Sequence, residues 1–390
     1  MRFLHTSDWH VGKVLRGHSR LDEQRAVLAE IVGLAREHAV DAVLISGDLY
    51  ETAAPAAEAQ QLVVRTLLAL RDTGAQVIAI AGNHDHAAAF DAYRPLMGEV
   101  GITLVGSIRR PQDGGVVSFT ARSTGEPVNV AVLPFLSQRY AVRAAQLVAQ
   151  TPAENSAGYD QMVRDVLAAL TASFTDDGVN IVMAHLTVTG AATGAGGERS
   201  AQTIFEYHVP ASAFGVRAHY VALGHLHRRQ SLPAPCPVHY CGAPYAIDFG
   251  EQDNTNVVLL VDASPATPAR VTDLPIKSGR RLRTVTGTVA ELGQRASEYG
   301  DDYLRVFVRE PYRAGLPDEV RATLPNVLQV RIDPEFSAPT HRAVHAASRA
   351  ASTPAELFAA FCAERGIDDP RLSALFGQLH DRVTSAGDDG

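Results

Sequence analysis

Apolar, strand-prone runs recur along the first two-thirds of the chain and alternate with stretches of helical periodicity. The helical stretches cover residues 21–38 and 56–72, where apolar positions return every three to four residues. The strand-like runs cover residues 3–6, 42–45, 76–80, 179–183 and 220–223. Strands that alternate with helices are typical of a sheet wrapped by helices, so the pattern predicts an α/β (α+β) fold.

A short polar motif follows each of these strand-like runs. The motifs are Asp8-Trp9-His10, Gly47-Asp48, Gly82-Asn83-His84-Asp85, a lone His185 and Gly224-His225-Leu226-His227. Open α/β sheets build their sites at the carboxyl ends of strands. We therefore expect these side chains to form one site.

Turn-forming glycine and proline residues separate the predicted strands and helices in the rest of the first 275 residues. Turn-rich stretches at 111–115 and 123–127 separate hairpin-like runs that begin a second sheet, which resumes at 128–133. Helices are predicted near 138–150 and 158–174, a Gly/Ala-rich loop at 189–198, and short strands up to about residue 275. These observations predict a first domain over residues 1–275.

The last 115 residues have a different pattern. Strands at 282–289, 303–309 and 327–332 around a helix at 290–299 predict a small α/β accessory domain over 276–335. An Ala/Ser/His-rich stretch suits a linker over 336–352. Residues 353–390 carry apolar positions at helical spacing, including Leu375 and Phe376, and predict two short amphipathic helices.

Composition and charge limit the class of protein and its possible partners. The 390 residues are 46% hydrophobic and 20% charged, which is enough for a large core and a second domain. A strand that begins at Met1-Arg2 leaves no room for a signal peptide. No apolar stretch reaches the length of a membrane span. We therefore expect a cytoplasmic protein with no membrane partner. The net charge of -8 argues against binding nucleic acid by bulk charge, but metals would neutralise several carboxylates, so DNA is not excluded.

The three cysteines, Cys236, Cys241 and Cys362, have no zinc-type spacing. We therefore expect them to be buried or inert thiols.

The motif residues suit a pair of metal ions. Oxygen and imidazole ligands without thiolates favour an ion such as manganese, and two ions about 3.5–4 Å apart can hold the attacking and leaving oxygens of an in-line displacement. Asp48 is the candidate bridge, since a Gly-Asp step at a strand end lets its carboxylate face two ions. Asp8 and His10 lie two apart on a backbone expected to be extended, so both can reach one ion, and His225 and His227 repeat that spacing.

The remaining motif residues have different expected roles. Asn83 offers a neutral ligand oxygen, whereas His84 is expected to donate a proton or hydrogen bond to phosphate and not to bind metal. His185 alone is weak support, because a lone buried histidine is commonly a core residue. Five motifs in order, each at a strand end, make the metal site the stronger interpretation.

This order of motifs resembles the calcineurin-like metallophosphoesterase superfamily, and the stretches Thr6-Ser7-Asp8-Trp9-His10-Val11-Gly12 and Gly82-Asn83-His84-Asp85 look like its SbcD branch. That branch is the bacterial counterpart of the meiotic-recombination nuclease subunit that processes double-strand breaks. The resemblance implies a β-sandwich flanked by helices, with a small capping domain and a helical tail. It covers about the first 275 residues through specific motifs, and the remainder in order and size.

The resemblance also implies a ligand set and partners. One metal would be held by Asp8, His10, Asp48 and His227, and the other by Asp48, Asn83, His185 and His225, with His84 as the catalytic histidine. The family is a manganese-dependent DNA exonuclease and endonuclease that acts with the ATPase SbcC in DNA repair and recombination. It usually dimerises, which implies a homodimer within a heterotetramer, and its location would be cytoplasmic and nucleoid-associated. The C-terminal helices would dock on SbcC.

Several alternatives stay open at this point. A small-nucleotide phosphodiesterase or a phosphoprotein phosphatase could use the same ligands, and a scaffold without activity is a third reading. The tail could pack on its own domain. Three further groups have two possible roles each. A basic loop could meet a phosphate backbone or face solvent; it contains Lys13, Arg16, His18 and Arg20. Asp85 could orient His84 or cap a turn, and the pair Arg228 and Arg229 could bind phosphate or form a solvated strand edge. Glu51 stands where many relatives carry His or Asp, which argues against a DNA-contacting or outer-shell role for this residue and leaves its part in the site open.

Overall fold

The computed structural model describes residues 1–136, 152–193 and 208–336, together with residues 358, 359, 361, 362, 371, 372, 375 and 376 near the C-terminus. The predicted helix at 138–150 lies outside the described residues, as do residues 337–352 of the predicted linker and residues 194–198 of the predicted loop. Among the described residues no helix is both long and apolar enough to cross a membrane.

The first sheet has six strands in the order β14-β13-β1-β4-β5-β6. Strands β1, β4, β5 and β6 run parallel, and β13 joins β1 antiparallel. The bounds are β1 Arg2–Thr6, β4 Ala42–Ile45, β5 Gln76–Ile80, β6 Ile102–Val105, β13 Val257–Ser264 and β14 Thr267–Pro275. The parallel strands are apolar on both faces, as expected of strands covered on both sides.

The second sheet also has six strands, in the order β11-β12-β10-β9-β8-β7. Strands β8, β9, β10 and β12 are parallel, and the edge strands β7 and β11 are antiparallel to their neighbours. The bounds are β7 Val116–Thr120, β8 Pro127–Leu133, β9 Val179–His185, β10 Tyr220–Gly224, β11 Gln230–Leu232 and β12 Val238–Tyr240. The predicted second sheet is confirmed.

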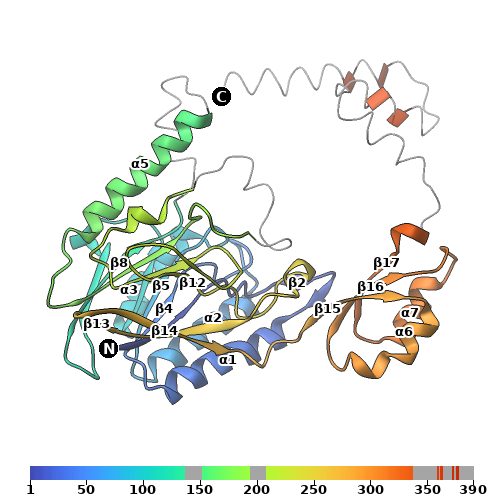
Figure 1. Cartoon of the computed structure of the whole chain (residues 1–390), viewed down its shortest axis with the longest axis horizontal. Helices are drawn as coiled ribbons and strands as arrows, with labels where there is room; N and C mark the ends of the chain where they lie inside the picture. The colour runs from blue at the N-terminus through green and yellow to red at the C-terminus, as the bar shows by residue number, and fades with distance from the viewer. Residues whose placement is uncertain are drawn as a thin grey trace. The chain divides into compact units, whose positions relative to one another are not determined.

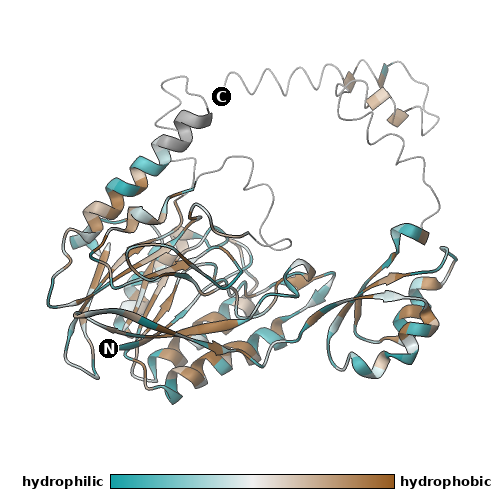
Figure 2. Ribbon diagram, in the orientation of Figure 1, coloured by the Kyte–Doolittle hydropathy of each residue, from teal (hydrophilic) through white to brown (hydrophobic). Residues whose placement is uncertain are grey.

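The two sheets pack face to face. Alternate residues of each strand point to opposite faces, so each sheet can turn one apolar face toward the other. Phe3, Leu44 and Ile78 of the first sheet share a buried core with Val130 and Ile181 of the second. Figure 2 shows apolar residues concentrated along the strands. The β-sandwich is therefore confirmed.

Helices cover the outer face of each sheet (Figure 1). On the first sheet, Leu4 and Val43 share a core with Ile31 of α1 and Leu67 of α2. On the second, Val182 shares a core with α5. The bounds are α1 Leu21–Glu37, α2 Ala57–Arg71, α3 Ala87–Glu99 and α5 Pro152–Thr171.

A third sheet of three strands, in the order β15-β16-β17, follows the sandwich in the sequence. Its bounds are β15 Leu282–Gly287, β16 Tyr303–Val308 and β17 Val327–Ile332, with helices α6 Val289–Gln294 and α7 Leu316–Thr323. Helix α6 begins in a capping box, since the Thr288 side chain accepts from the Glu291 backbone N–H and the Glu291 carboxylate accepts from that of Thr288. The helix predicted over 290–299 is shorter than expected, and a 3₁₀ turn replaces its second half.

By packing, the chain divides into two units. One contains Met1–Phe307 with Pro317–Arg331, and the other contains Val308–Leu316 with the residues from Ile332 onward. The domain boundaries at 275, 335 and 352 stay predictions.

Candidate metal centre

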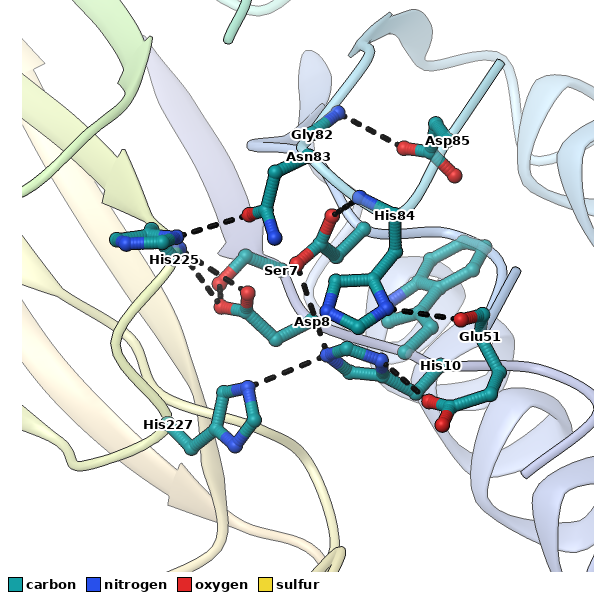
Figure 3. A network of polar contacts seen from close by, with 12 residues as sticks. Ser7, Asp8, His10, Glu51, Gly82, Asn83, His84, Asp85, His225 and His227 are labelled. Carbon is teal, nitrogen blue, oxygen red and sulfur yellow. Dashed lines mark hydrogen bonds and ion pairs between the residues drawn. The ribbon is translucent and has the colours of Figure 1, made fainter. Parts of the chain in front are cut away.

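The five predicted motifs meet at one end of the sandwich. Strands β1, β4 and β5 are parallel neighbours in the first sheet, and β9 and β10 are parallel neighbours in the second, so their carboxyl ends lie together. Figure 3 shows Asp8, His10, Asn83, His225 and His227 turned toward one another from the two sheets. Every ligand predicted from the sequence lies in this cluster.

The backbone around Asp8 and His10 differs from the prediction. Both residues have positive φ, 54° and 44°, so they do not lie on an extended strand. Such a conformation is unusual for residues with side chains, and it is held here by the backbone of the next motif. The Asp8 N–H donates to the Gly47 carbonyl and the His10 N–H to the Asp48 carbonyl, each at 3.0 Å. The side chains of Asp8 and His10 therefore approach the same predicted metal position from a loop with left-handed backbone and not from an extended strand.

Asp48 lies between two groups of ligands. Its Oδ2 is 3.7 Å from Nε2 of His10 and 3.4 Å from Nε2 of His185. Burial raises the pKa of this carboxyl, but the neighbouring His185 and His10 outweigh burial and lower it below its ordinary value. An ionised carboxylate between two imidazole pairs is the arrangement expected of a bridging ligand.

In the part of the chain that the structure describes, side chains form three groups whose atoms lie close enough together to hold a metal ion, and one of them consists of His10, Asp48 and His84. The other two groups correspond to the two predicted metal positions. In one of these, atoms of Asp8, His10 and His227 all lie within 4.8 Å of one another, and in the other, atoms of Asp48, His185 and His225 do so. Oδ1 of Asn83 lies 2.9 Å from ring nitrogens of both His185 and His225. These oxygen and nitrogen donors fit hard to borderline divalent ions.

Each histidine that faces this centre through Nε2 is held by a partner on Nδ1. Glu51 contacts Nδ1 of His10 at 2.9 Å, and Glu251 contacts Nδ1 of His227 at 2.8 Å. The Ser46 carbonyl accepts from Nδ1 of His185 at 2.7 Å. A hydrogen bond at Nδ1 leaves Nε2 of a neutral ring unprotonated for a metal. Burial lowers the pKa of His185, but the neighbouring Asp48 carboxylate outweighs burial and raises it to about 9, so a metal at this Nε2 would displace a proton. Burial also lowers the pKa of His225 to about 3, which keeps that ring neutral.

Sequence reasoning missed Ser46 and Glu251, and it argued against the outer-shell position that Glu51 takes beside His10. Glu251 lies 24 residues beyond His227, and no spacing rule connects the two positions. Ser46 acts through its backbone carbonyl, so its side chain carries no signal for this contact.

His84, the predicted catalytic histidine, lies beside the predicted ligands Asp48 and His10. Its backbone N–H donates to Oδ1 of Asp48 at 2.8 Å, and its Nδ1 donates to the carbonyl oxygen of Glu51 at the same distance. The side chain is partly exposed, and its ring meets that of His10 edge-on with centroids 4.7 Å apart. With Nδ1 bound to the backbone, Nε2 is the nitrogen left to contact a substrate phosphate.

Three of the residues with two possible roles, Asp85, Arg20 and Arg229, make contacts within the protein. The Asp85 carboxylate accepts from the backbone N–H groups of Leu49, Tyr50 and Gly82, so it ties two loops together and does not orient His84. Arg20 is buried in an ion pair with Glu23, so it neither faces solvent nor is free to meet a phosphate backbone, the two roles left open for the basic loop. Arg229 is held by Asp273 at 2.9 Å. The three cysteines are free and buried, as predicted.

The fold and the site define a metal-dependent phosphoesterase, and the model of the calcineurin-like phosphoesterase family matches residues 1–229. Relatives named as the SbcD component of the nuclease SbcCD are similar over most of the chain. The Bacillus subtilis protein is 35% identical over 72% of this chain and 71% of its own length. The Rhodobacter capsulatus protein is 33% identical over 70% and 69%, and the Escherichia coli K12 protein is 28% identical over 77% and 74%. The chain therefore belongs to the calcineurin-like phosphoesterase family, in the branch of the SbcD nucleases.

Membership of the phosphoesterase family and the geometry of the candidate metal centre both indicate metal-dependent hydrolysis of phosphate esters. Divalent metal ions, when bound, polarise the phosphate and supply a hydroxide nucleophile at neutral pH. The residues that would hold such ions are Asp48 and the side chains around it, and His84 lies beside Asp48 and His10.

Proposed function

We propose that the protein is the manganese-dependent nuclease subunit of an SbcCD-type complex, which hydrolyses phosphodiester bonds at DNA ends and hairpins during repair and recombination. The observation that carries the proposal is the carboxylate of Asp48 between two groups of side chains that could each hold a metal ion, with His84 beside it. The names of the relatives support a nuclease over a phosphatase. The work would take place in the cytoplasm, in association with the nucleoid.

In this proposal each residue has one task. Asp8, His10 and His227 hold one Mn²⁺ and Asn83, His185 and His225 hold the other, with Asp48 shared. Because the Nδ1–H of His84 is bound to the Glu51 carbonyl, His84 would act through Nε2 as the doubly protonated imidazolium. In that form it would stabilise charge on the phosphate or protonate the leaving oxygen, which is typically worth about 10²–10⁴-fold in rate.

Apolar residues described near the C-terminus support an ATPase partner of the SbcC type. The rings of Phe358 and Phe376 stack with centroids 4.2 Å apart. Leu372 and Leu375 are left 38% and 49% exposed. An exposed apolar pair on a helix favours docking against another apolar surface, and we propose that this surface belongs to the partner.

A second copy of the chain is the proposed partner of another surface. Large apolar side chains of α3 are exposed, notably Tyr93 at 53% and Leu96 at 64%. They border a largely apolar groove of about 380 Å³ between α2 and α3. We propose that this helix pair forms the homodimer, which would carry two ATPase subunits in a heterotetramer.

The test is cleavage of linear double-stranded DNA and of bis-p-nitrophenyl phosphate by the purified protein with Mn²⁺, with and without the ATPase subunit. The matched control is His84→Ala, which should lose activity on both substrates. Cleavage of the small diester but not of DNA, even with the partner, would assign the site to a small-nucleotide phosphodiesterase instead.

A further inference from the structure

Glu51 contacts the metal centre in two ways at once. Its carboxylate Oε2 lies 2.9 Å from Nδ1 of His10, and its backbone carbonyl oxygen lies 2.8 Å from Nδ1 of His84. Figure 3 shows both contacts, with the two imidazole rings beside Glu51. Within the described residues, no other residue bonds to both His10 and His84 through Nδ1.

Each of these bonds decides which nitrogen of an imidazole ring is available. A carboxylate or a carbonyl can only accept, so Nδ1 of each histidine carries the proton. Nε2 of His10 then faces the metal position, where it lies 3.7 Å from Oδ2 of Asp48 and 3.2 Å from Nε2 of His227. Nε2 of His84 is likewise left for a substrate.

The loop that carries Glu51 is held in place on both sides. The Glu51 N–H donates to the carbonyl of Val11 at 3.1 Å, and the Val11 N–H donates to the carbonyl of Leu49 at 3.0 Å. Oε1 of Glu51 accepts from Nζ of Lys13 at 2.7 Å. Lys13 therefore occupies the second carboxylate oxygen and directs the first one at His10. This pairing also removes Lys13 from the set of free cations expected in the basic loop.

We propose that Glu51 is a positioning residue that fixes His10 and His84 together, with Lys13 holding its carboxylate toward His10. The inference rests on the proposed metal ligands and assigns no catalytic step to Glu51. The glutamate side chain is long enough to reach the ligand ring and Lys13 at the same time, one with each carboxylate oxygen.

The contacts of the Glu51 side chain and of its backbone carbonyl can be tested separately. Glu51→Ala removes the bond to His10 but keeps the carbonyl that holds His84. Loss of such a partner typically weakens metal binding about 10–100-fold. We therefore expect weaker Mn²⁺ affinity, with kcat on bis-p-nitrophenyl phosphate restored at saturating Mn²⁺ and KM unchanged. Glu51→Gln keeps one acceptor oxygen and should lose less, and Lys13→Met should lose less than Glu51→Ala.

The experiment is a calorimetric Mn²⁺ titration of the full-length chain, with histidine tautomers read from ¹⁵N chemical shifts in the metal-free protein. Glu58→Gln is the matched control, because Glu58 is an exposed glutamate in the first turn of α2. In Glu51→Ala the His10 tautomer should become mixed while His84 keeps its proton on Nδ1. Thermal unfolding of each variant checks that it is folded, and Glu51→Gln provides the comparison if Glu51→Ala is not.

Two failures can be told apart. If the wild-type chain binds no Mn²⁺ and cleaves neither substrate, the proposed function is wrong. If the wild type binds Mn²⁺ and Glu51→Ala binds it with the same affinity and the same His10 tautomer, Glu51 is only the loop partner of Lys13 and the inference is overturned.

Discussion

At the scale of single residues, the site depends on which atom of each side chain faces inward. Asp48 and the histidines are common residue types, and their chemistry comes from burial and from fixed partners such as Glu251 and the Ser46 carbonyl. The sequence motifs identify the residues that meet at the candidate metal centre. They do not identify partners that act from distant positions or through the backbone, because those positions carry no spacing signal.

A pair of substitutions separates the bridging ligand from the catalytic histidine. Asp48→Asn removes the charge shared by both metal positions, so the variant should bind neither Mn²⁺ ion tightly. His84→Ala should bind two ions normally and lose about 10²–10⁴-fold in kcat, since its proposed task is proton or hydrogen-bond donation. Metal stoichiometry by atomic absorption, with bis-p-nitrophenyl phosphate kinetics, measures both. Loss of both metals in His84→Ala would refute its assignment as a non-ligand.

At the scale of elements, the sequence predicts most of what carries the site. The five strand ends and helices α1 and α2 follow from period-2 and period-3.6 patterns of apolar residues. Among the elements that the pattern left without a definite prediction are α3, which contains Pro95, and the short helix α7. The expected extended backbone at Asp8 and His10 was wrong, because contacts with the next motif hold a left-handed conformation that local sequence does not specify.

Close packing between the strand-end loops gives an element-scale prediction. Gly82 lies against Asp48, and a Cβ at this position would overlap the Asp48 carboxylate and backbone nitrogen. Gly82→Ala should therefore destabilise the fold by about 1–3 kcal/mol and weaken Mn²⁺ binding, because Asp48 must move.

The matched control for that substitution is Gly33→Ala. Gly33 lies on the exposed side of α1 with open space at its Cβ, so alanine should stabilise the helix by about 0.5–1 kcal/mol. Urea unfolding of both variants measures the difference. Equal stability of Gly82→Ala and the wild type, with unchanged metal affinity, would contradict the packing described for this loop.

At the scale of the whole molecule, the chain combines a buried metal centre with exposed apolar surfaces on other elements. Fold and family were predictable from the motifs because the ligands stand in order along the chain. The proposed interaction surfaces are less evident in the sequence, since an apolar stripe at helical spacing looks alike whether it covers a core or a partner.

The tail surface predicts a loss of partner binding without loss of chemistry. Leu375→Asp places a charge in the exposed apolar pair and should weaken binding to the ATPase subunit by at least about tenfold, which corresponds to about 1.4 kcal/mol. Val216→Asp is the control, because Val216 is 78% exposed on the metal-binding unit. Surface plasmon resonance measures affinity, and both variants should hydrolyse bis-p-nitrophenyl phosphate at the wild-type rate. Equal affinity of the two variants would remove the docking proposal.

The α3 surface predicts a change in oligomeric state. Leu96→Asp should shift the chain from dimer to monomer, because a charge at an apolar interface is left desolvated. Sedimentation equilibrium of the wild type and the variant gives the masses directly. A wild-type chain that sediments at 41.7 kDa at every concentration would contradict the homodimer.

The central claim is that Asp48 joins two metal positions, and anomalous diffraction at the manganese edge from crystals soaked in Mn²⁺ tests it most directly. Two peaks about 3.5–4 Å apart should flank the Asp48 carboxylate, one beside Asp8, His10 and His227 and the other beside Asn83, His185 and His225. A single peak, or two peaks that do not share Asp48, would contradict the two-metal site.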